Sequence, residues 1–363
     1  MKKLVLIFCL TFFSAMAVHA QQHDFPSLTG PYFGQKPPGT TPEIFAPGVV
    51  SSKDHIEMGC TWSPDLKEFY FARSETSELS SNWAIWCIRE KDGVWTEPRV
   101  VPFSGVYRDF GPFIPPDGKH LIFIRRNNKE NETRMGSWIV DRTGNTWSEP
   151  RFFHDAYTLN TKDFRTFYFT TERNKEASQD IGQINFDNGV FSEPVSLPGE
   201  LNSKAWEAHP QISPDGSYMI FDRKGSTFVS FLRENGTWSR GYDMGRQYFV
   251  PAISPDGKYI FFESEDDICW VDAKIVEEFR IHDAQRDDFP VLNGPYLGQK
   301  PPGMTPEVFA PHILSRVEPE WAYCAEFSPD GSAFYYTEVD PATGIPRIMT
   351  MRRIAGAWTA PEA

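Results

Sequence analysis

Acidic and arginine side chains recur in this 363-residue chain at fixed distances from a set of similar turns. Eight residues before the turn aspartate, four successive units carry an acid: Glu57, Asp109, Asp155 and Glu207. Tyr248 takes that position in a fifth unit. Arginines follow the turns, eight residues after the aspartate at Arg73, Arg125 and Arg223, and ten residues after it at Arg173. This register predicts that the nine residues gather at one end of a repeated structure.

Such a cluster of charges has three possible roles. Each arginine can pair with the acid of its own unit and brace the fold. Alternatively, the nine residues can form a ligand-binding site for a polar or charged molecule, because clustered charges must stay solvated or meet a partner. The third interpretation is catalytic. Glycoside hydrolysis uses a pair of carboxyl groups, and Glu57, Asp109 and Glu207 are the candidates by analogy of fold.

The element that positions these charges is a turn followed by an apolar strand. The clearest turns are Ser63-Pro64-Asp65, Pro116-Asp117-Gly118, Ser213-Pro214-Asp215-Gly216, Ser254-Pro255-Asp256-Gly257 and Ser328-Pro329-Asp330-Gly331, with a divergent copy at Lys162-Asp163. Proline sets φ, aspartate accepts backbone N–H bonds and glycine takes a positive φ. The β-branched and aromatic residues that follow predict a buried strand.

A second marker closes most units, as in Trp95-Thr96-Glu97-Pro98 and Trp147-Ser148-Glu149-Pro150. Each unit of roughly 45 residues then holds four antiparallel strands, which is the pattern of a propeller blade. We therefore predict an all-β fold, a five-bladed β-propeller with four-stranded antiparallel blades. A β-sandwich gives no reason for one turn to repeat in one register. In a propeller, the acids and arginines lie at one mouth of the central channel.

We assign the propeller to residues 41–282. Its last blade, residues 250–279, lacks a closing strand, and the segment Thr41–Pro47 resembles the missing one. Pairing this N-terminal strand with the last blade would close the ring and remove two open edges.

A longer repeat follows the propeller. The segment Asp24–Pro47 recurs as Asp288–Pro311, with 19 of 24 residues identical. Residues 283–363 are predicted to be this repeated arm and one blade of a truncated second copy. The alternative is that the extra blade enlarges the first ring.

The N-terminus has the pattern of a secretory signal peptide over residues 1–20, with cleavage after Ala20, and residues 21–40 form an N-terminal arm. We expect a periplasmic or secreted protein that does not insert into a membrane after cleavage. A formal net charge of −13 argues against nucleic acid as a partner. The four remaining cysteines show no metal-ligand spacing and are predicted to be buried free thiols. No cofactor and no metal is expected.

The turn, the apolar strand and the Trp-Ser-Glu-Pro closure resemble the WD40-like, TolB-type β-propeller repeat of bacterial exported proteins. The resemblance covers nearly all of residues 41–282 and the last blade. It implies the propeller fold, and no Gly-x-Ser-x-Gly elbow of a peptidase domain accompanies it. We expect a non-catalytic propeller that binds a glycan, peptide or envelope protein at its charged mouth. A glycan-active hydrolase is the alternative.

Overall fold

The computed structural model describes residues 25–126, 135–173, 178–197, 201–203, 205–245, 249–280, 292–307, 309–310, 314, 322–339, 345–354, 356–359 and 361. The predicted signal peptide lies outside the described residues. No helix in the described part of the chain is long and apolar enough to cross a membrane.

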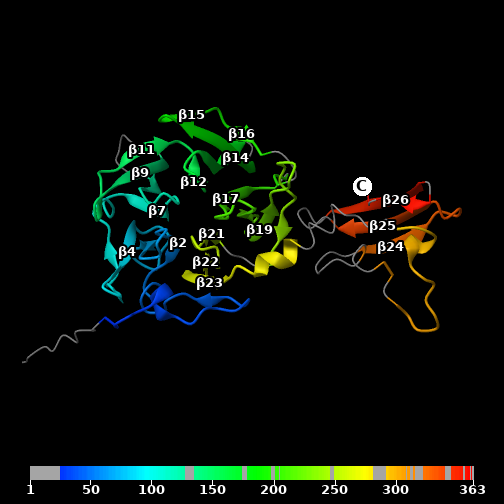
Figure 1. Ribbon diagram of the computed structural model, residues 1–363, viewed down its shortest axis with the longest axis horizontal. Helices are drawn as coiled ribbons and strands as arrows, with labels where there is room; N and C mark the ends of the chain where they lie inside the picture. Colours follow the sequence, from blue (N-terminus) through cyan, green and yellow to red (C-terminus); the bar gives the residue numbers. More distant parts are fainter. Residues whose placement is uncertain are drawn as a thin grey trace, which may run out of the picture.

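The described chain is all-β and forms small antiparallel sheets, most of them arranged in a ring (Figure 1). One sheet contains β2 (Glu57–Trp62), β3 (Glu68–Ser74), β4 (Trp83–Lys91), β5 (Val94–Trp95) and β6 (Arg99–Val100). The next contains β7 (Arg108–Phe113), β8 (His120–Arg126), β9 (Met135–Thr143), β10 (Thr146–Trp147) and β11 (Arg151–His154). A third contains β12 (Tyr157–Thr161), β13 (Thr166–Arg173), β14 (Ser178–Asp187), β15 (Val190–Phe191) and β16 (Val195–Ser196).

The fourth sheet contains β17 (Glu207–Ile212), β18 (Tyr218–Arg223), β19 (Ser226–Phe231) and β20 (Tyr242–Asp243). Another contains β21 (Phe249–Ile253), β22 (Tyr259–Ser264), β23 (Asp267–Asp272) and the N-terminal strand β1 (Glu43–Ile44). A short helix covers residues 275–280. The C-terminal sheet contains β24 (Ala322–Phe327), β25 (Ala333–Val339), β26 (Pro346–Ile354) and β27 (Ala357–Trp358).

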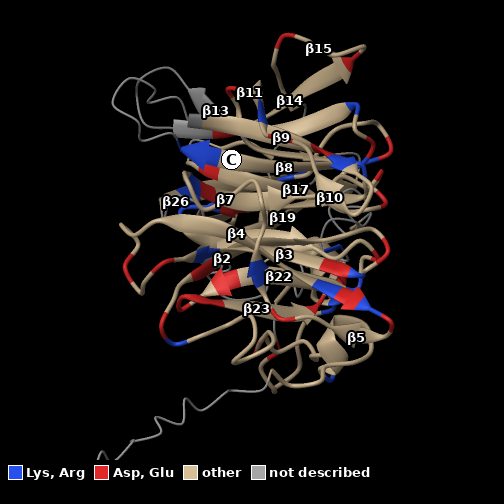
Figure 2. Cartoon of the chain, turned by 90° about the vertical axis from the view of Figure 1, so that its left-hand side faces the viewer, with Lys and Arg blue, Asp and Glu red and all other residues tan. Residues whose placement is uncertain are grey.

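The repeated turns share one hydrogen-bonded arrangement. The serine hydroxyl donates to the aspartate carboxylate at 2.6 Å in Ser63–Asp65 and in Ser213–Asp215, and at 2.8 Å in Ser254–Asp256. The serine oxygen also accepts the backbone N–H at the start of the next strand; the N–H of Glu68, for example, donates to the hydroxyl oxygen of Ser63 at 2.9 Å. The turn sequence therefore fixes where each second strand begins. Charged segments lie mainly at strand ends and in loops (Figure 2).

The ring closes through its N-terminal segment. Glu43 and Ile44 of β1 pair antiparallel with Trp270 and Cys269 of β23, and the backbone N–H of Phe45 donates to the carbonyl of Ile268 at 2.8 Å. The strand from the start of the propeller thus completes the sheet at its end. Inner strand β2 contacts both β7 and β21, and β17 contacts both β12 and β21, so neighbouring sheets pack face to face around the ring.

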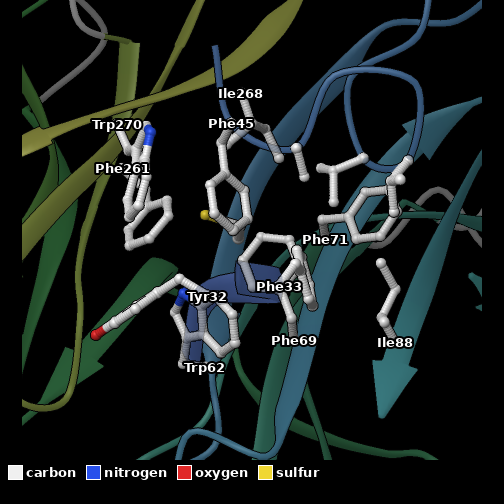
Figure 3. Close-up of a cluster of buried hydrophobic side chains, with 14 of the residues drawn as sticks. Tyr32, Phe33, Phe45, Trp62, Phe69, Phe71, Ile88, Phe261, Ile268 and Trp270 are labelled. Carbon is white, nitrogen blue, oxygen red and sulfur yellow. The ribbon is translucent and has the colours of Figure 1, made fainter. Parts of the chain in front are cut away.

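The largest core cluster lies at this junction (Figure 3). Phe45 is fully buried against Phe69, Phe261 and Trp270, with ring centroids 5.0–5.3 Å apart. Tyr32, from the 3-10 turn η1 (Pro31–Gly34), packs beside them and donates its hydroxyl to Asp256 at 2.9 Å. The arm therefore joins the first and last sheets of the ring.

The C-terminal sheet repeats the arm contacts of the first sheet. The side chain of Gln299 accepts the N–H of Ala310 at 2.7 Å, as Gln35 accepts that of Ala46 at 2.7 Å. A 3-10 turn, η2 (Tyr296–Gly298), matches η1, and a separate core cluster contains Leu297, Phe334 and Trp358. The long sequence repeat is thus also a structural repeat.

The four cysteines beyond the predicted signal peptide are free thiols. Cys60, Cys87 and Cys269 are buried as expected, and burial raises the pKa of the Cys87 and Cys269 thiols to about 11. Cys324 is exposed, which corrects the prediction. It lies on β24, and none of the described contacts places a neighbouring sheet against that inner strand.

Candidate functional site

Three of the predicted acid–arginine pairs form among the described side chains, each within its own sheet. The guanidinium Nε lies 2.8 Å from the carboxylate in Arg73–Glu57, 2.7 Å in Arg125–Asp109 and 2.8 Å in Arg223–Glu207. The two partners stand directly opposite each other on the two innermost strands. The hairpin closed by the aspartate turn therefore brings them together.

These six side chains lie inside the wall of the propeller, which corrects the expectation that they face an open mouth. Glu57, Asp109 and Glu207 are 0% exposed, and the arginines are 5–9% exposed. Aromatic rings cover the guanidinium groups. That of Arg125 lies 4.7 Å from the ring centre of Tyr107 and 5.3 Å from that of Trp138, distances typical of cation–π contacts.

Each arginine also holds the segment that leads into its own sheet. Its Nη2 donates to a backbone carbonyl of that segment: Val50 at 2.7 Å, Phe103 at 2.7 Å or Leu201 at 2.6 Å. A nearby serine hydroxyl, of Ser52, Ser104 or Ser203, donates to the acid. We call each set of arginine, acid, serine and carbonyl a brace. A serine four or five residues before each acid is the sequence signal that could have revealed it.

Burial shifts the titration of the brace carboxyls. It raises the pKa of Glu57, Asp109 and Glu207, while the paired arginine and the serine hydroxyl oppose that rise. Burial also lowers the pKa of Arg73, and Glu57 opposes that shift. Mutual pairing is therefore what allows these charges to be buried.

A cavity of about 900 Å³ lies at the same end of the sheets as the braces. It is lined by residues from most sheets of the ring: Met58, Trp83, Arg108, Phe110, Gly111, Ile124, Arg126, His154, Asp155, Ala156, Thr158, Phe169, Thr170, Pro194, Trp206, His209, Phe249 and Val250. We call this the mouth cavity. Among the predicted site residues that the structure describes, Asp155 alone lines it. The side chain of Arg173 and the whole of Tyr248 lie outside the described residues.

A β-bulge follows the acid position in each inner strand of the ring. Shortly after the acid position, each inner strand of the ring shifts register against its partner. A residue with positive φ marks each bulge: Gly59 (58°), Gly111 (60°), Thr158 (55°), His209 (51°) and Val250 (48°). A bulge re-aims the side chains beside it. Met58, Phe110 and Phe249 precede their bulges and line the cavity one position after the predicted residues, because consecutive residues of a strand point to opposite faces.

Three of these bulge residues are not glycine. A positive φ costs about 1–3 kcal/mol for an ordinary side chain and is an outlier for a β-branched residue such as Val250. Thr158, His209 and Val250 all line the mouth cavity. The surrounding sheets therefore hold strained backbone at the cavity floor.

His209 is the best-positioned titratable group at this floor. Its Nδ1 lies 2.6 Å from the carboxylate of Asp222, which is buried behind it. Burial raises the pKa of Asp222, and the imidazole opposes that rise. A carboxylate that holds Nδ1 fixes the orientation and the tautomer of the ring.

The described residues contain no group of three or more His, Cys, Asp and Glu side chains arranged to hold a metal ion. The cavity chemistry rests on aromatic rings, two histidines and the arginines Arg108 and Arg126.

No protein-family model and no curated protein matches the chain. Among solved structures, a TolB-type protein from Agrobacterium tumefaciens matches over 84% of this chain and 83% of its own, at 15% identity and a TM-score of 0.41. In fold, the chain is similar to the TolB-type β-propellers. A gluconolactonase from Xanthomonas campestris matches 68% of this chain and 97% of its own, at 9% identity and a TM-score of 0.40. An exo-1,5-α-L-arabinanase from a bovine ruminal metagenomic library matches 86% and 99%, at 12% identity and a TM-score of 0.34. These likenesses concern the fold.

Proposed function

We propose that the chain is an exported, non-catalytic, five-bladed propeller that binds a glycan, peptide or protein partner in the mouth cavity. The supporting observation is the cavity itself. Its volume of about 900 Å³ falls within the range of about 300–1,000 Å³ of small-molecule sites, and its wall combines apolar and aromatic surface with a few polar groups.

The state of the three candidate catalytic acids supports a binding role. A glycosidase needs two carboxyl groups that face the scissile bond about 5–10 Å apart. Glu57, Asp109 and Glu207 are each buried and each bonded to an arginine in a brace. In that arrangement they contribute to the fold and not to the surface that a substrate would touch.

One observation favours a hydrolase as the second candidate. His209 lines the cavity, and Asp222 holds its Nδ1 at 2.6 Å. An imidazole fixed in this way is suited to act as a general base. Turnover of a polysaccharide by the purified protein, abolished by His209→Gln without loss of folding, would establish this candidate in place of the binding role.

A ligand screen by thermal shift tests the binding role. Compounds that raise the melting temperature are then titrated against Phe249→Ala and Trp206→Ala, which remove aromatic surface from the cavity. We expect both variants to weaken binding. The proposal fails if every stabilising compound binds these variants as tightly as the original protein.

We further propose that the protein is periplasmic or secreted, with cleavage after Ala20, an arm at residues 21–40 and the propeller at residues 41–282. Residues 283–363 would form the repeated arm and one blade of a second copy. The separate core cluster of the β24–β27 sheet supports this division.

A further inference from the structure

Two arginines line the mouth cavity from neighbouring strands. Arg108 of β7 and Arg126 of β8 stand directly opposite each other in the strand register. Like charges placed directly opposite on a sheet repel and are destabilising. A bound negative charge between the two guanidinium groups would offset this repulsion.

Neither arginine forms an ion pair with an acid among the described residues. Arg108 donates an Nη2 hydrogen bond to the backbone carbonyl of Leu79, and Arg126 is exposed. Other arginines of the same sheet differ, since Arg125 pairs with Asp109 and Arg151 with Asp141. Asp155 is the one acid among the described residues that line the cavity, so the two arginines leave its lining with one more positive than negative charge.

From these observations we propose that the mouth cavity recognises the carboxylate of an acidic oligosaccharide, with Arg108 and Arg126 as its ligands. This rests on the proposed binding role and names its ligand class. A guanidinium matches a carboxylate in a bidentate geometry, which a neutral sugar cannot use.

The cavity wall strengthens such a contact. Apolar and aromatic residues, including Ile124, Trp206 and Phe249, line the same space. They reduce access of water, so that the attraction between a guanidinium and a carboxylate is screened less than in bulk solvent. The whole chain carries a net charge of −13, so its overall field repels anions and recognition must come from local cations.

The aromatic lining favours a sugar ring over a peptide. Trp206 and Phe249 flank His209, with ring-centre distances of 6.4 and 5.1 Å. Flat rings of this kind fit the apolar face of a pyranose. Asp155 and Thr158 also line the cavity and supply oxygen atoms of the type that bonds sugar hydroxyls. A uronate carries both the ring and the carboxylate.

The test is a calorimetric titration with trimers of galacturonate, glucuronate and mannuronate, each compared with its own methyl ester. Esterification removes the charge and keeps the ring. We expect at least one acid trimer to bind about tenfold more tightly than its ester, as the loss of a charged hydrogen bond implies. Arg108→Gln and Arg126→Gln should each remove about that factor. Arg99→Gln, a change at an exposed arginine of β6 outside the cavity lining, is the matched control and should leave the affinity unchanged.

Several results would overturn the inference. They are equal binding of acid and ester, an equal loss of affinity in Arg99→Gln, tighter binding of an acetylated tetraglutamate peptide, or no binding of any trimer. Neutral or peptide ligands that still depend on Trp206 and Phe249 would overturn this ligand class and leave the binding role standing. The absence of any cavity ligand would remove both.

Discussion

Arg125 and Arg126 are adjacent in the chain and have opposite environments. Arg125 is buried, pairs with Asp109 and reaches the carbonyl of Phe103. Arg126 is exposed at the cavity. The alternation of a β-strand sends consecutive side chains to opposite faces. One arginine therefore stabilises the sheet, and the next is available to a ligand.

The brace should be a large contributor to stability. An exposed ion pair contributes about 0–1 kcal/mol, whereas removing one partner of a buried pair costs about 3–5 kcal/mol. We expect Arg125→Ala to lower the free energy of unfolding by the larger amount in urea denaturation. Arg151→Ala is the control, because Arg151 forms a pair with Asp141 whose side chains are 54% and 43% exposed. Similar losses in the two variants would contradict the structural role of the brace.

Glu263 predicts a pH dependence of stability. Burial, together with nearby Asp266 and Asp222, raises its pKa from 4.5 to about 7, and its Oε2 has no hydrogen-bond partner among the described residues. A carboxyl whose folded pKa is raised contributes stability below its unfolded pKa and loses it as the pH rises through the folded value.

We therefore expect the stability of the original protein to fall by about 3 kcal/mol between roughly pH 4.5 and pH 8, relative to Glu263→Gln. Urea denaturation across this range measures the difference. Glu149→Gln, at an exposed glutamate, should follow the original protein. Parallel curves for the original protein and Glu263→Gln would contradict the raised pKa.

For single residues, the sequence predicts which side chains pair with each other better than it predicts which side chains are exposed at the cavity. The spacing of Glu57 and Arg73 around a tight turn is enough to place them opposite each other. Their burial depends on rings contributed by other strands, such as that of Trp86, 5.0 Å from the Arg73 guanidinium. The bulge residues Thr158, His209 and Val250 also line the cavity, and a strand read by strict alternation does not show these bulges. Arg108 and Arg126 belong to no repeated spacing, so a search by repeat register passes over them.

At the scale of elements, the arm and β1 form a clasp between the first and last sheets. Phe45 enters the core there, and the hydroxyl of Ser51 donates to the carbonyl of Ile268 at 3.2 Å. Sequence alone points to this pairing, because the last blade lacks a closing strand and the arm resembles one. The sequence does not show that β1 is only two residues long. So short a strand forms few backbone hydrogen bonds, and the packing of the Phe45 side chain adds to the stability of the pairing.

Phe45→Ala should weaken the clasp. Replacing a buried phenylalanine with alanine costs about 3–5 kcal/mol, and Phe45 is fully buried. Tryptophan fluorescence follows the unfolding, because Trp62 and Trp270 contact Phe45. Phe309→Ala is the control, since Phe309 occupies the same position in the repeated arm and packs on Phe327 and Phe334 instead. If both variants destabilised the ring equally, the clasp would not be specific to β1.

For the whole molecule, the C-terminal unit has its own core and an exposed blade face. Tyr335 and Ile348 are 39% and 67% exposed, whereas the matching Tyr70 and Ile85 in the ring are fully buried by the β7–β11 sheet. The copy therefore reproduces the fold of a blade, and none of the described element contacts joins its strands to another sheet.

A chain that ends at residue 282 tests the independence of the ring. The described core clusters of the ring contain no residue beyond Phe279, and the C-terminal cluster contains no residue of the ring. We expect the shortened protein to keep the melting temperature of the ring within about 2 °C, with loss of any separate transition from residues 283–363. A drop of 10 °C or more would mean that the last sheet is part of the ring.

The left-handed bulges also bear on how such a protein could change its ligand over generations. Five strands bend in the same way, yet two of the bends carry glycine and the others carry Thr158, His209 and Val250. The same backbone bulge forms with glycine and with larger residues, so the side chain at a bulge can differ while the backbone of the sheets stays the same. Exchanging Thr158, His209 and Val250 would change the chemistry of the cavity lining, and a library varied at these three positions would explore new specificities. Gly59 and Gly111 stay glycine in such a library, because an added Cβ would lie 3.2 Å from the Gly111 Cα or from the Ile124 Cδ1.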